Sequence, residues 1–313
     1  MATVQDSEIA SSPGPLLIVG RQGQLATDLV EAGARLGTAL VALGRPELDL
    51  ADPTSIERAF ARHEPSAVIN AGAYTAVDRA ESEPELAFAV NRDGPARLAR
   101  LCRSAGVPLI HVSTDQVFDG EKPGGHKESD PARPLCTYGR SKLEGERAVA
   151  EAHPDALIVR VSWVFGPSGN NFVTRLLEWA RTRESVTIVS DQRGRPTYSP
   201  ALAEALLGLA EQMREDVARK REREIRGILH LAGASVMTRY EQALAVMAAS
   251  KARGGPALRV EPILTRDFPT PATRPLNAEL DVSLAGERYG IRLRTFEEDL
   301  EATLDRLLGP RRP

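Results

Sequence analysis

The chain has 313 residues, of which 42% are hydrophobic and 27% charged, and its formal net charge is −3 at pH 7. This composition suits a globular enzyme of one large or two unequal domains and gives no reason to expect nucleic acid or a membrane surface as a partner. No apolar run is long enough to span a bilayer, and two cysteines, Cys102 and Cys136, cannot form a disulfide scaffold, which favours a reducing, cytoplasmic setting.

The first fourteen residues are small and polar and lack the basic start and apolar core of a signal peptide. We expect a disordered tail over residues 1–14. The five histidines show no metal-ligand spacing, so we expect no metal ligands among the side chains.

Residues 15–19 form an apolar run typical of a buried parallel strand, and a helical pattern begins at Leu25. Between them lies a glycine turn. Strand, glycine turn and helix together are the context in which a dinucleotide pyrophosphate binds at a helix N-terminus. The predicted cofactor-binding residues of this turn are Gly20, Arg21, Gly23, Gln24 and Leu25.

The second predicted strand covers 38–43, and no acidic residue ends it. An acid at that place would hold a ribose hydroxyl, whereas Arg45, with help from Arg21, suits a 2′-phosphate. The sequence therefore favours NADP(H), with NAD(H) as the alternative. Asp49 and Leu50 are candidates for contacting the adenine.

A third strand is predicted over 67–70, followed by small residues that let a flat cofactor lie against the backbone. A long helical segment then runs from about 76 to 105 with a break at Pro84. The cofactor-binding candidates of this stretch are Ala71, Gly72, Ala73, Tyr74 and Asn91.

The fourth strand, predicted over 107–112, runs into Ser113, Thr114 and Asp115. Because parallel sheets bind ligands at the carboxyl ends of their strands, these three residues are site candidates. A loop rich in glycine and proline over 120–134 then leads to Tyr138.

Tyr138 and Lys142 are four residues apart, so on a helix they share one face. A nearby cation favours the phenolate and lowers the pKa of a tyrosine. The pair is therefore a plausible acid–base unit for chemistry at a carbonyl or an alcohol, and both residues are also candidates for contacting the cofactor.

The second half of the chain reads as a smaller, mixed part. We expect strands over 186–189 and 228–231, helices over 200–213, 238–250 and 296–308, and an extended loop over 268–275 across the site. The stretch 211–226 interleaves both signs of charge and reads as a solvated helix or insertion.

These elements predict an α/β fold: a Rossmann-type doubly wound parallel sheet with a smaller mixed α/β substrate-binding domain. We expect an NAD(P)-binding domain over 15–165 and a mostly substrate-binding domain over 166–313, with about 198–233 returning to the first sheet.

Taken together, the motifs resemble the extended short-chain dehydrogenase/reductases, and within them the dTDP-4-dehydrorhamnose reductases. The resemblance covers nearly the whole chain. It rests on segments 23–25, 75–81, 113–115, 138–142, 160–165, 169–172, 191–197 and 268–275.

The resemblance implies that Tyr138 protonates the C4 oxygen of a nucleotide-linked 6-deoxy-4-ketosugar while NADPH delivers hydride. Lys142 would tune the pKa of Tyr138 and hold the nicotinamide ribose, and Thr114 would bind the reacting oxygen. It further implies that Val77, Asp115 and Trp163 line the sugar pocket and that Asn171 and Arg274 contact the nucleotide diphosphate.

Two residues depart from the family pattern, Gln116 in place of tyrosine and Ala26 in place of glycine. Related dehydratases resemble this strand end but carry Asp-Glu, and the amide of Gln116 is no base, which disfavours dehydration. Three alternatives stay open: an epimerase, a reductase of another nucleotide sugar (streptose-type), and a non-catalytic NADP-binding subunit resembling the methionine adenosyltransferase β subunit. The resemblance also leaves open a monomer or a homodimer, and a Mg²⁺ ion at a dimer interface as in some relatives.

Overall fold

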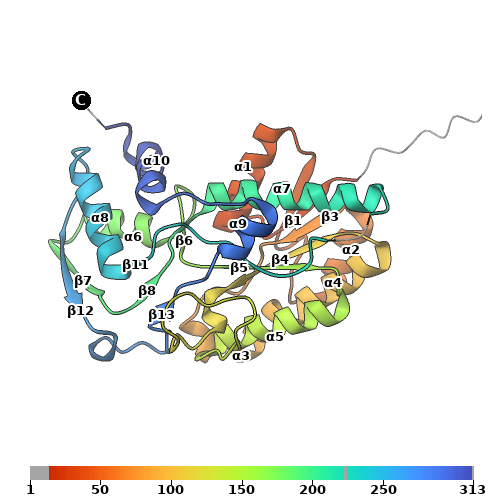
Figure 1. Ribbon diagram of the computed structural model, residues 1–313, viewed down its shortest axis with the longest axis horizontal. Helices are drawn as coiled ribbons and strands as arrows, with labels where there is room; N and C mark the ends of the chain where they lie inside the picture. The colour runs from red at the N-terminus through yellow and green to blue at the C-terminus, as the bar shows by residue number, and fades with distance from the viewer. Residues whose placement is uncertain (1–13, 222–223, 312–313) are drawn as a thin grey trace, which may run out of the picture.

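The protein is described by a computed structural model over residues 14–221 and 224–311. In this part of the chain the centre is a parallel six-stranded sheet, in the order β10-β5-β4-β3-β1-β2 (Figure 1). Its strands are β1 (Leu16–Val19), β2 (Leu40–Leu43), β3 (Ala67–Asn70), β4 (Leu109–Thr114), β5 (Leu157–Val161) and β10 (Gly227–His230). The predicted Rossmann-type α/β fold is confirmed.

Both faces of the sheet are covered by helices because its strands are apolar on both sides. Leu16 and Ile18 point to the face that α1 (Gln24–Leu36) and α7 (Ser199–Ala218) cover, and Leu17 and Val19 point to the other. The opposite face packs against α2 (Pro53–His63), α4 (Gly94–Ala105) and α5 (Thr137–Ala152), as Figure 1 shows for α4 and α5 below the sheet.

The strand order reverses between β1 and β3. From β1 the chain moves outward to β2 and then returns past β1 to β3 and β4. Connections on the two sides of this point leave in opposite directions, which opens a crevice at the carboxyl ends of the strands. The polar residues that follow β1, β3 and β4 therefore face one another.

The predicted break at Pro84 is present, but the helical segment 76–105 is divided further than expected. The segment contains η1 (Arg79–Glu81), α3 (Pro84–Phe88), the π-helical turn η2 (Ala89–Asp93) and α4. Prolines stand in the first turn of both α3 and α4, where their missing N–H is tolerated, so each starts a new helix. Gly94 also lies against Leu50, whose carbonyl oxygen would be 2.2 Å from an added Cβ.

β4 begins two residues later than the predicted 107–112 and continues to Thr114. Ser113 and Thr114 are therefore the last residues of a central strand, where sheet pairing with β5 holds their backbone. This placement fixes the position of both side chains at the crevice.

The second part of the chain packs around its own apolar cluster, in which Phe165 meets Phe296 with ring centroids 5.1 Å apart. Its larger elements are α6 (Phe172–Trp179), the parallel pair β7 (Ser185–Val189) and β12 (Arg259–Ile263), α8 (Arg239–Lys251) and α10 (Phe296–Leu308). Its short elements are β6 (Val164–Phe165), β8 (Arg193–Gly194), β9 (Thr197–Tyr198), β11 (Met237–Thr238), η4 (Thr265–Asp267), β13 (Asn277–Ala278) and α9 (Ser283–Tyr289).

α7 and β10 belong to the layers of the central sheet, although they follow the first elements of the second part. α7 continues to Ala218 and takes up the first half of the charged stretch 211–226, while residues 222 and 223 lie outside the described residues. The tail predicted over 1–14 also lies outside them, apart from Gly14. Within the described ranges no helix has both the length and the apolar character that crossing a membrane requires.

Candidate active site

A cleft of about 920 Å³ opens at the carboxyl ends of the central strands. Most of the predicted site residues line it: Gly20, Arg21, Gly23, Gln24, Leu25, Arg45, Asp49, Leu50, Ala71, Gly72, Ala73, Tyr74, Val77, Ser113, Thr114, Asp115, Tyr138, Trp163 and Arg274. Three predicted residues, Asn91, Lys142 and Asn171, are instead buried behind its wall.

In the glycine turn after β1, the position of Gly20 has no room for a side chain. Gly20 has φ +115°, and an added Cβ would lie 2.9 Å from the backbone nitrogen of Gly72. Gly23 is the N-cap of α1 and supplies no capping side chain, so this helix N-terminus is open toward the cleft. The Nε2 of Gln24 beside it is buried without a hydrogen-bond partner. These features fit a phosphate-bearing cofactor that meets backbone N–H groups.

The residues after β2 carry the charges of the predicted adenosine end. Arg45 is exposed, and no ion pair involves it among the described residues. Arg21 pairs with Glu47 at 3.2 Å, with both side chains about half exposed. One oxygen of Asp49 accepts a hydrogen bond from the backbone of Ala51 at 2.9 Å, which leaves its second oxygen for a ligand.

Asn91 holds the loop after β3 in place from behind. Its side chain is fully buried, accepts from the backbone nitrogen of Tyr74 at 2.8 Å, and donates to the carbonyl of Tyr74 and to Ser141 Oγ. The side-chain amide of Asn91 is thus bonded within the protein, where it orders the loop at Tyr74. Its contact with the cofactor stays a prediction. The phenol of Tyr74 donates to Glu83 at 2.6 Å.

Thr114 and Asp115 form the floor of the cleft. Thr114 Oγ1 donates to one carboxylate oxygen of Asp115 at 2.9 Å, and Ser162 Oγ donates to the other at 2.7 Å. Burial raises the pKa of Asp115, while these hydrogen bonds oppose the shift. Asp115 therefore orients the hydroxyl of Thr114 at the place where a reacting oxygen can bind.

Tyr138 begins the first turn of α5 and is 8% exposed. Burial raises the pKa of its phenol, an interaction with Thr114 lowers it, and the negative charge of Asp115 raises it further. Burial is the largest of these effects, and Lys142 is not among the groups that act on this pKa. The tuning of Tyr138 by Lys142 stays a prediction.

Lys142 lies one turn further along α5, and its Nζ donates to the carbonyl of Val112 at 2.8 Å. Burial lowers its pKa to about 8, and the carboxylate of Glu146 opposes this shift. Glu146 is held by Arg160 through Nε at 2.9 Å and Nη2 at 2.7 Å, and by Ser113 Oγ at 2.5 Å. A buried chain of charges therefore runs from Lys142 through Glu146 to Arg160.

Arg274 comes from the loop predicted over 268–275 and reaches the cleft as expected. Its two terminal nitrogens donate to the two carboxylate oxygens of Asp78 at 3.0 and 2.9 Å. This pair lowers the pKa of Asp78. The ion pair ties the C-terminal loop to the loop after β3 and closes one side of the cleft.

Asn171 caps α6. Its Oδ1 accepts from the backbone nitrogens of Val173 and Thr174, and its Nδ2 donates to two backbone carbonyls, at Gly166 and Ser168. All of its hydrogen-bonding groups are thereby used inside the loop. The predicted diphosphate contact is replaced by a supporting role, because this cap holds the neighbouring cleft residues 169 and 170 in place.

Arg239 is a cleft residue that the sequence reasoning missed. Its guanidinium lies over the ring of Trp163 with Cζ 3.6 Å from the centroid, a cation–π contact worth about 0.5–2 kcal/mol. A signal was available in the sequence, because Arg239 stands in the first turn of α8, where the helix dipole disfavours a cation.

Within residues 14–221 and 224–311 no group of three or more His, Cys, Asp or Glu side chains could hold a metal ion. The option of a Mg²⁺ ion at a dimer interface thus has no support in the described residues. Cys136 is buried, and its thiol accepts from the backbone nitrogen of Gly139 at 3.4 Å as the cap of α5.

The doubly wound parallel sheet, the open glycine turn and the buried Tyr138 beside Thr114 together define an NAD(P)-binding oxidoreductase of the short-chain type. The family model described as "RmlD substrate binding domain" matches residues 14–308. The dTDP-4-dehydrorhamnose reductase of Sinorhizobium fredii is 41% identical over 283 residues, which cover 90% of this chain and 94% of the relative. That of Mycobacterium tuberculosis is 42% identical over 265 residues, covering 83% and 82%.

The structure of dTDP-4-dehydrorhamnose reductase from Bacillus anthracis in complex with NADP is similar to this fold. It superposes with a TM-score of 0.85 at 28% identity and covers 94% of this chain and 99% of its own. The chain therefore belongs to the dTDP-4-dehydrorhamnose reductase family, and the resemblance inferred from its motifs is confirmed.

Proposed function

We propose that this protein reduces the C4 keto group of dTDP-4-dehydro-L-rhamnose with NADPH, giving dTDP-L-rhamnose. Two relatives that are 41% and 42% identical to this chain over most of their own length are named dTDP-4-dehydrorhamnose reductase. The observation that carries the proposal is the buried Tyr138 beside Thr114 at the floor of the cleft.

The cofactor end of the cleft fits NADPH. The close approach of Gly20 to Gly72 and the uncapped N-terminus of α1 make room for a pyrophosphate, and Arg45 and Arg21 offer cations to a 2′-phosphate. NADP in the B. anthracis relative supports the same preference, with NAD(H) as the alternative. When bound, the reduced nicotinamide supplies the hydride that adds to C4.

The chain itself supplies the proton. As the carbonyl carbon gains hydride, negative charge develops on its oxygen, and the phenolic O–H of Tyr138 donates its proton to that oxygen. Thr114 Oγ1 donates its one hydrogen to Asp115 in the structure, and we propose that it turns this hydrogen to the same oxygen when the substrate binds. A phenol holds its proton at neutral pH even at its ordinary pKa of about 10, so Tyr138 has the proton to give.

The sugar is proposed to lie between Val77, Asp115 and Trp163, with Arg274 at the edge of the cleft. Lys142 would support the reacting end from behind through the backbone carbonyl of Val112. The division into a cofactor-binding part and a substrate-binding part, the cytoplasmic location and the choice between monomer and homodimer remain predictions.

The test is NADPH oxidation followed by absorbance, with the ketosugar generated in the same tube from dTDP-glucose by the upstream enzymes. We expect one NADPH consumed for each dTDP-rhamnose formed, and a loss of 10²- to 10⁴-fold (an order-of-magnitude range) in Tyr138→Phe, whose NADPH affinity stays unchanged. NADPH binding without ketosugar-dependent oxidation by the unaltered protein would refute the proposal. Undiminished turnover in Tyr138→Phe would remove Tyr138 from its role.

A further inference from the structure

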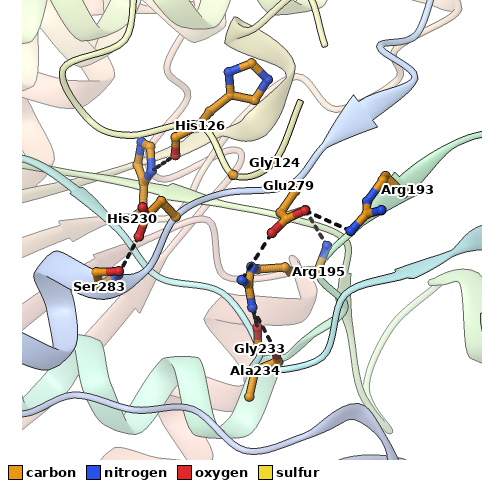
Figure 2. A network of polar contacts seen from close by, with 12 residues as sticks. Gly124, His126, Arg193, Arg195, His230, Gly233, Ala234, Glu279 and Ser283 are labelled. Carbon is orange, nitrogen blue, oxygen red and sulfur yellow. Dashed lines mark hydrogen bonds and ion pairs between the residues drawn. The ribbon is translucent and has the colours of Figure 1, made fainter. Parts of the chain in front are cut away.

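Several arginines stand near the sugar side of the cleft, and most already have carboxylate partners. Arg274 is paired with Asp78. Figure 2 shows Arg193 and Arg195 converging on Glu279, at 3.1 and 3.4 Å. Arg195 also donates to the carbonyls of residues 233 and 234, so its guanidinium is held inside the protein. Arg193 and Arg195 are thus paired within the second part of the chain, and Arg274 is paired with a residue of the first part.

Arg239 differs from them. No ion pair involves it among the described residues, and the one hydrogen bond of its guanidinium goes to the neutral amide oxygen of Gln242 at 3.0 Å. Asp115 is the carboxylate whose charge acts on Arg239, and both of its oxygens already accept hydrogen bonds, from Thr114 and Ser162. Arg239 is therefore a cation in the cleft wall with donors still to satisfy.

Aromatic rings cover part of this half-buried cation. The ring centroids of Trp163 and Phe172 lie 3.6 and 5.0 Å from its Cζ. Burial lowers the pKa of Arg239 to about 9; the charge of Asp115 opposes this shift, and that of Arg274 adds to it. A partly desolvated cation without an ion-pair partner gains from a bound anion.

Trp163 has no free ring face in this arrangement. An added Cβ on Gly194 would lie 2.6 Å from Cε2 and 2.9 Å from both Nε1 and Cζ2. In the plane of the ring, an atom approaching between Nε1 and Cζ2 would lie closer to them than to Cε2. The added Cβ lies closer to Cε2, so it stands above the ring plane, and the backbone of Gly194 packs on that face. The guanidinium of Arg239 covers the other. A sugar can stack on this ring only if Arg239 moves.

We propose that Arg239 binds the diphosphate of the nucleotide sugar, and that in doing so its guanidinium leaves the face of Trp163 and exposes it to the sugar ring. This inference rests on the proposed function, because it concerns the substrate of the same cleft. Two or more charge-assisted hydrogen bonds to phosphate oxygens are stronger than one cation–π contact, so the exchange is favourable.

The distances within the substrate agree with this arrangement. In a 4-ketopyranose the reacting carbonyl and the anomeric oxygen that carries the diphosphate lie at opposite ends of one sugar ring. Thr114 and Tyr138 mark the carbonyl end, and Trp163 with Arg239 lies beside Asp115 on the wall next to them. We therefore expect a single sugar to reach from the reacting oxygen to the guanidinium.

The experiment compares dTDP with thymidine, and UDP with uridine, on the complex of the protein with NADP⁺. Calorimetry gives the dissociation constants, with ligand-observed NMR where binding is weak. The variants are Arg239→Gln, Arg239→Lys and the charge control Arg266→Gln, whose exposed side chain lies on η4 away from the cleft. We expect Arg239→Gln to weaken the binding of the nucleoside diphosphate by on the order of 10- to 100-fold and the binding of the nucleoside by less than about threefold. Arg239→Lys should be intermediate, Arg266→Gln unchanged, and NADP⁺ affinity the same in all four proteins.

Equal weakening of the diphosphate and the nucleoside would overturn the proposal, since it would mean that Arg239 only shapes the pocket. An unchanged diphosphate affinity, a loss confined to NADP⁺, or no binding of either diphosphate by the unaltered protein would overturn it as well. The ketosugar assay separates this result from the proposed function. If the unaltered protein turns over the ketosugar but Arg239→Gln binds dTDP with unchanged affinity, the proposed function stands and the proposed role of Arg239 is wrong. If the protein binds UDP through Arg239 but does not reduce the ketosugar, Arg239 binds the diphosphate of another nucleotide sugar and the proposed function is wrong.

Discussion

The ammonium of Lys142 donates to the backbone carbonyl of Val112, 2.8 Å away, from a side chain that is only 2% exposed. Glu146 on the same helix favours its charge, while His111, which faces it from β4, stays neutral because burial and the charge of Lys142 hold its pKa well below the usual range. The cation thus remains poorly compensated, which burial makes costly.

We predict that Lys142→Met is more stable than the unaltered protein and inactive. The pKa of Lys142 falls from 10.5 to about 8 on folding, so between these values the unfolded chain holds a proton that the native lysine has lost. Stability therefore rises with pH across that window, and below about 8 the cost of burying the charge is fully present. Removing it should stabilise the fold by on the order of 1–3 kcal/mol at pH 7. Urea unfolding at pH 7 and pH 10 checks this, because the gain should shrink at the higher pH. A loss of stability that is the same at both values would contradict it.

The pair of Glu146 and Arg160 gives a second prediction. Both side chains are 3% exposed, so removing one partner leaves a buried charge uncompensated. Glu146→Gln should cost about 3–5 kcal/mol of unfolding free energy, whereas the double change Glu146→Leu with Arg160→Met should recover most of it. Thermal and urea unfolding of Glu146→Leu, Arg160→Met and the double variant form the cycle. Additive losses in the double variant would show that the pair is not coupled.

Gly20 and Gly37 make a matched pair for testing the glycine turn. Both have positive φ, +115° and +69°, but a Cβ on Gly20 would lie 2.9 Å from the backbone of Gly72, whereas nothing lies within 4 Å of one on Gly37. Gly37→Ala should cost roughly 1–2 kcal/mol and leave NADPH binding unchanged.

Gly20→Ala should cost more stability and weaken NADPH by at least about tenfold, because the two loops that form the cofactor end of the cleft must separate. Calorimetric titration with NADPH and urea unfolding on both variants decide the matter. Equal behaviour of the two alanine variants would mean that the contact between the loops does not shape the cofactor site.

The parallel sheet was predictable because its strands are short apolar runs with turn residues at their ends, and the glycine turn follows the first of them. The cleft residues that follow β1, β3 and β4 were predictable for the same reason, since strand ends meet at one edge. Family resemblance added Val77, Trp163 and Arg274, which local pattern alone does not single out.

What the sequence could not predict are contacts between distant segments. Whether Asn171 is free or capping depends on carbonyls at residues 166 and 168 that fold back on it. Whether Arg274 is free depends on Asp78, nearly two hundred residues away. The spacing of Tyr138 and Lys142 indicates that the two residues share a helix face, but it does not report the burial of the phenol, which raises the pKa of Tyr138.

The last prediction concerns the choice between NADPH and NADH. Arg45 is exposed at the end of β2, lines the cleft and has no ion-pair partner among the described residues, whereas Arg21 is paired with Glu47. Arg45→Ala should therefore weaken NADPH by on the order of 10- to 100-fold and NADH by less than about threefold. Glu47→Gln should strengthen the binding of NADPH and leave that of NADH nearly unchanged, because it releases Arg21 and removes a negative charge from the same end of the cleft.

Arg58→Ala, an exposed change on α2 outside the cleft, serves as the control for net charge. Dissociation constants for both cofactors in all four proteins are the measurement. If Arg45→Ala weakened both cofactors equally, Arg45 would not read the 2′-phosphate, and NAD(H) would regain equal standing as the cofactor.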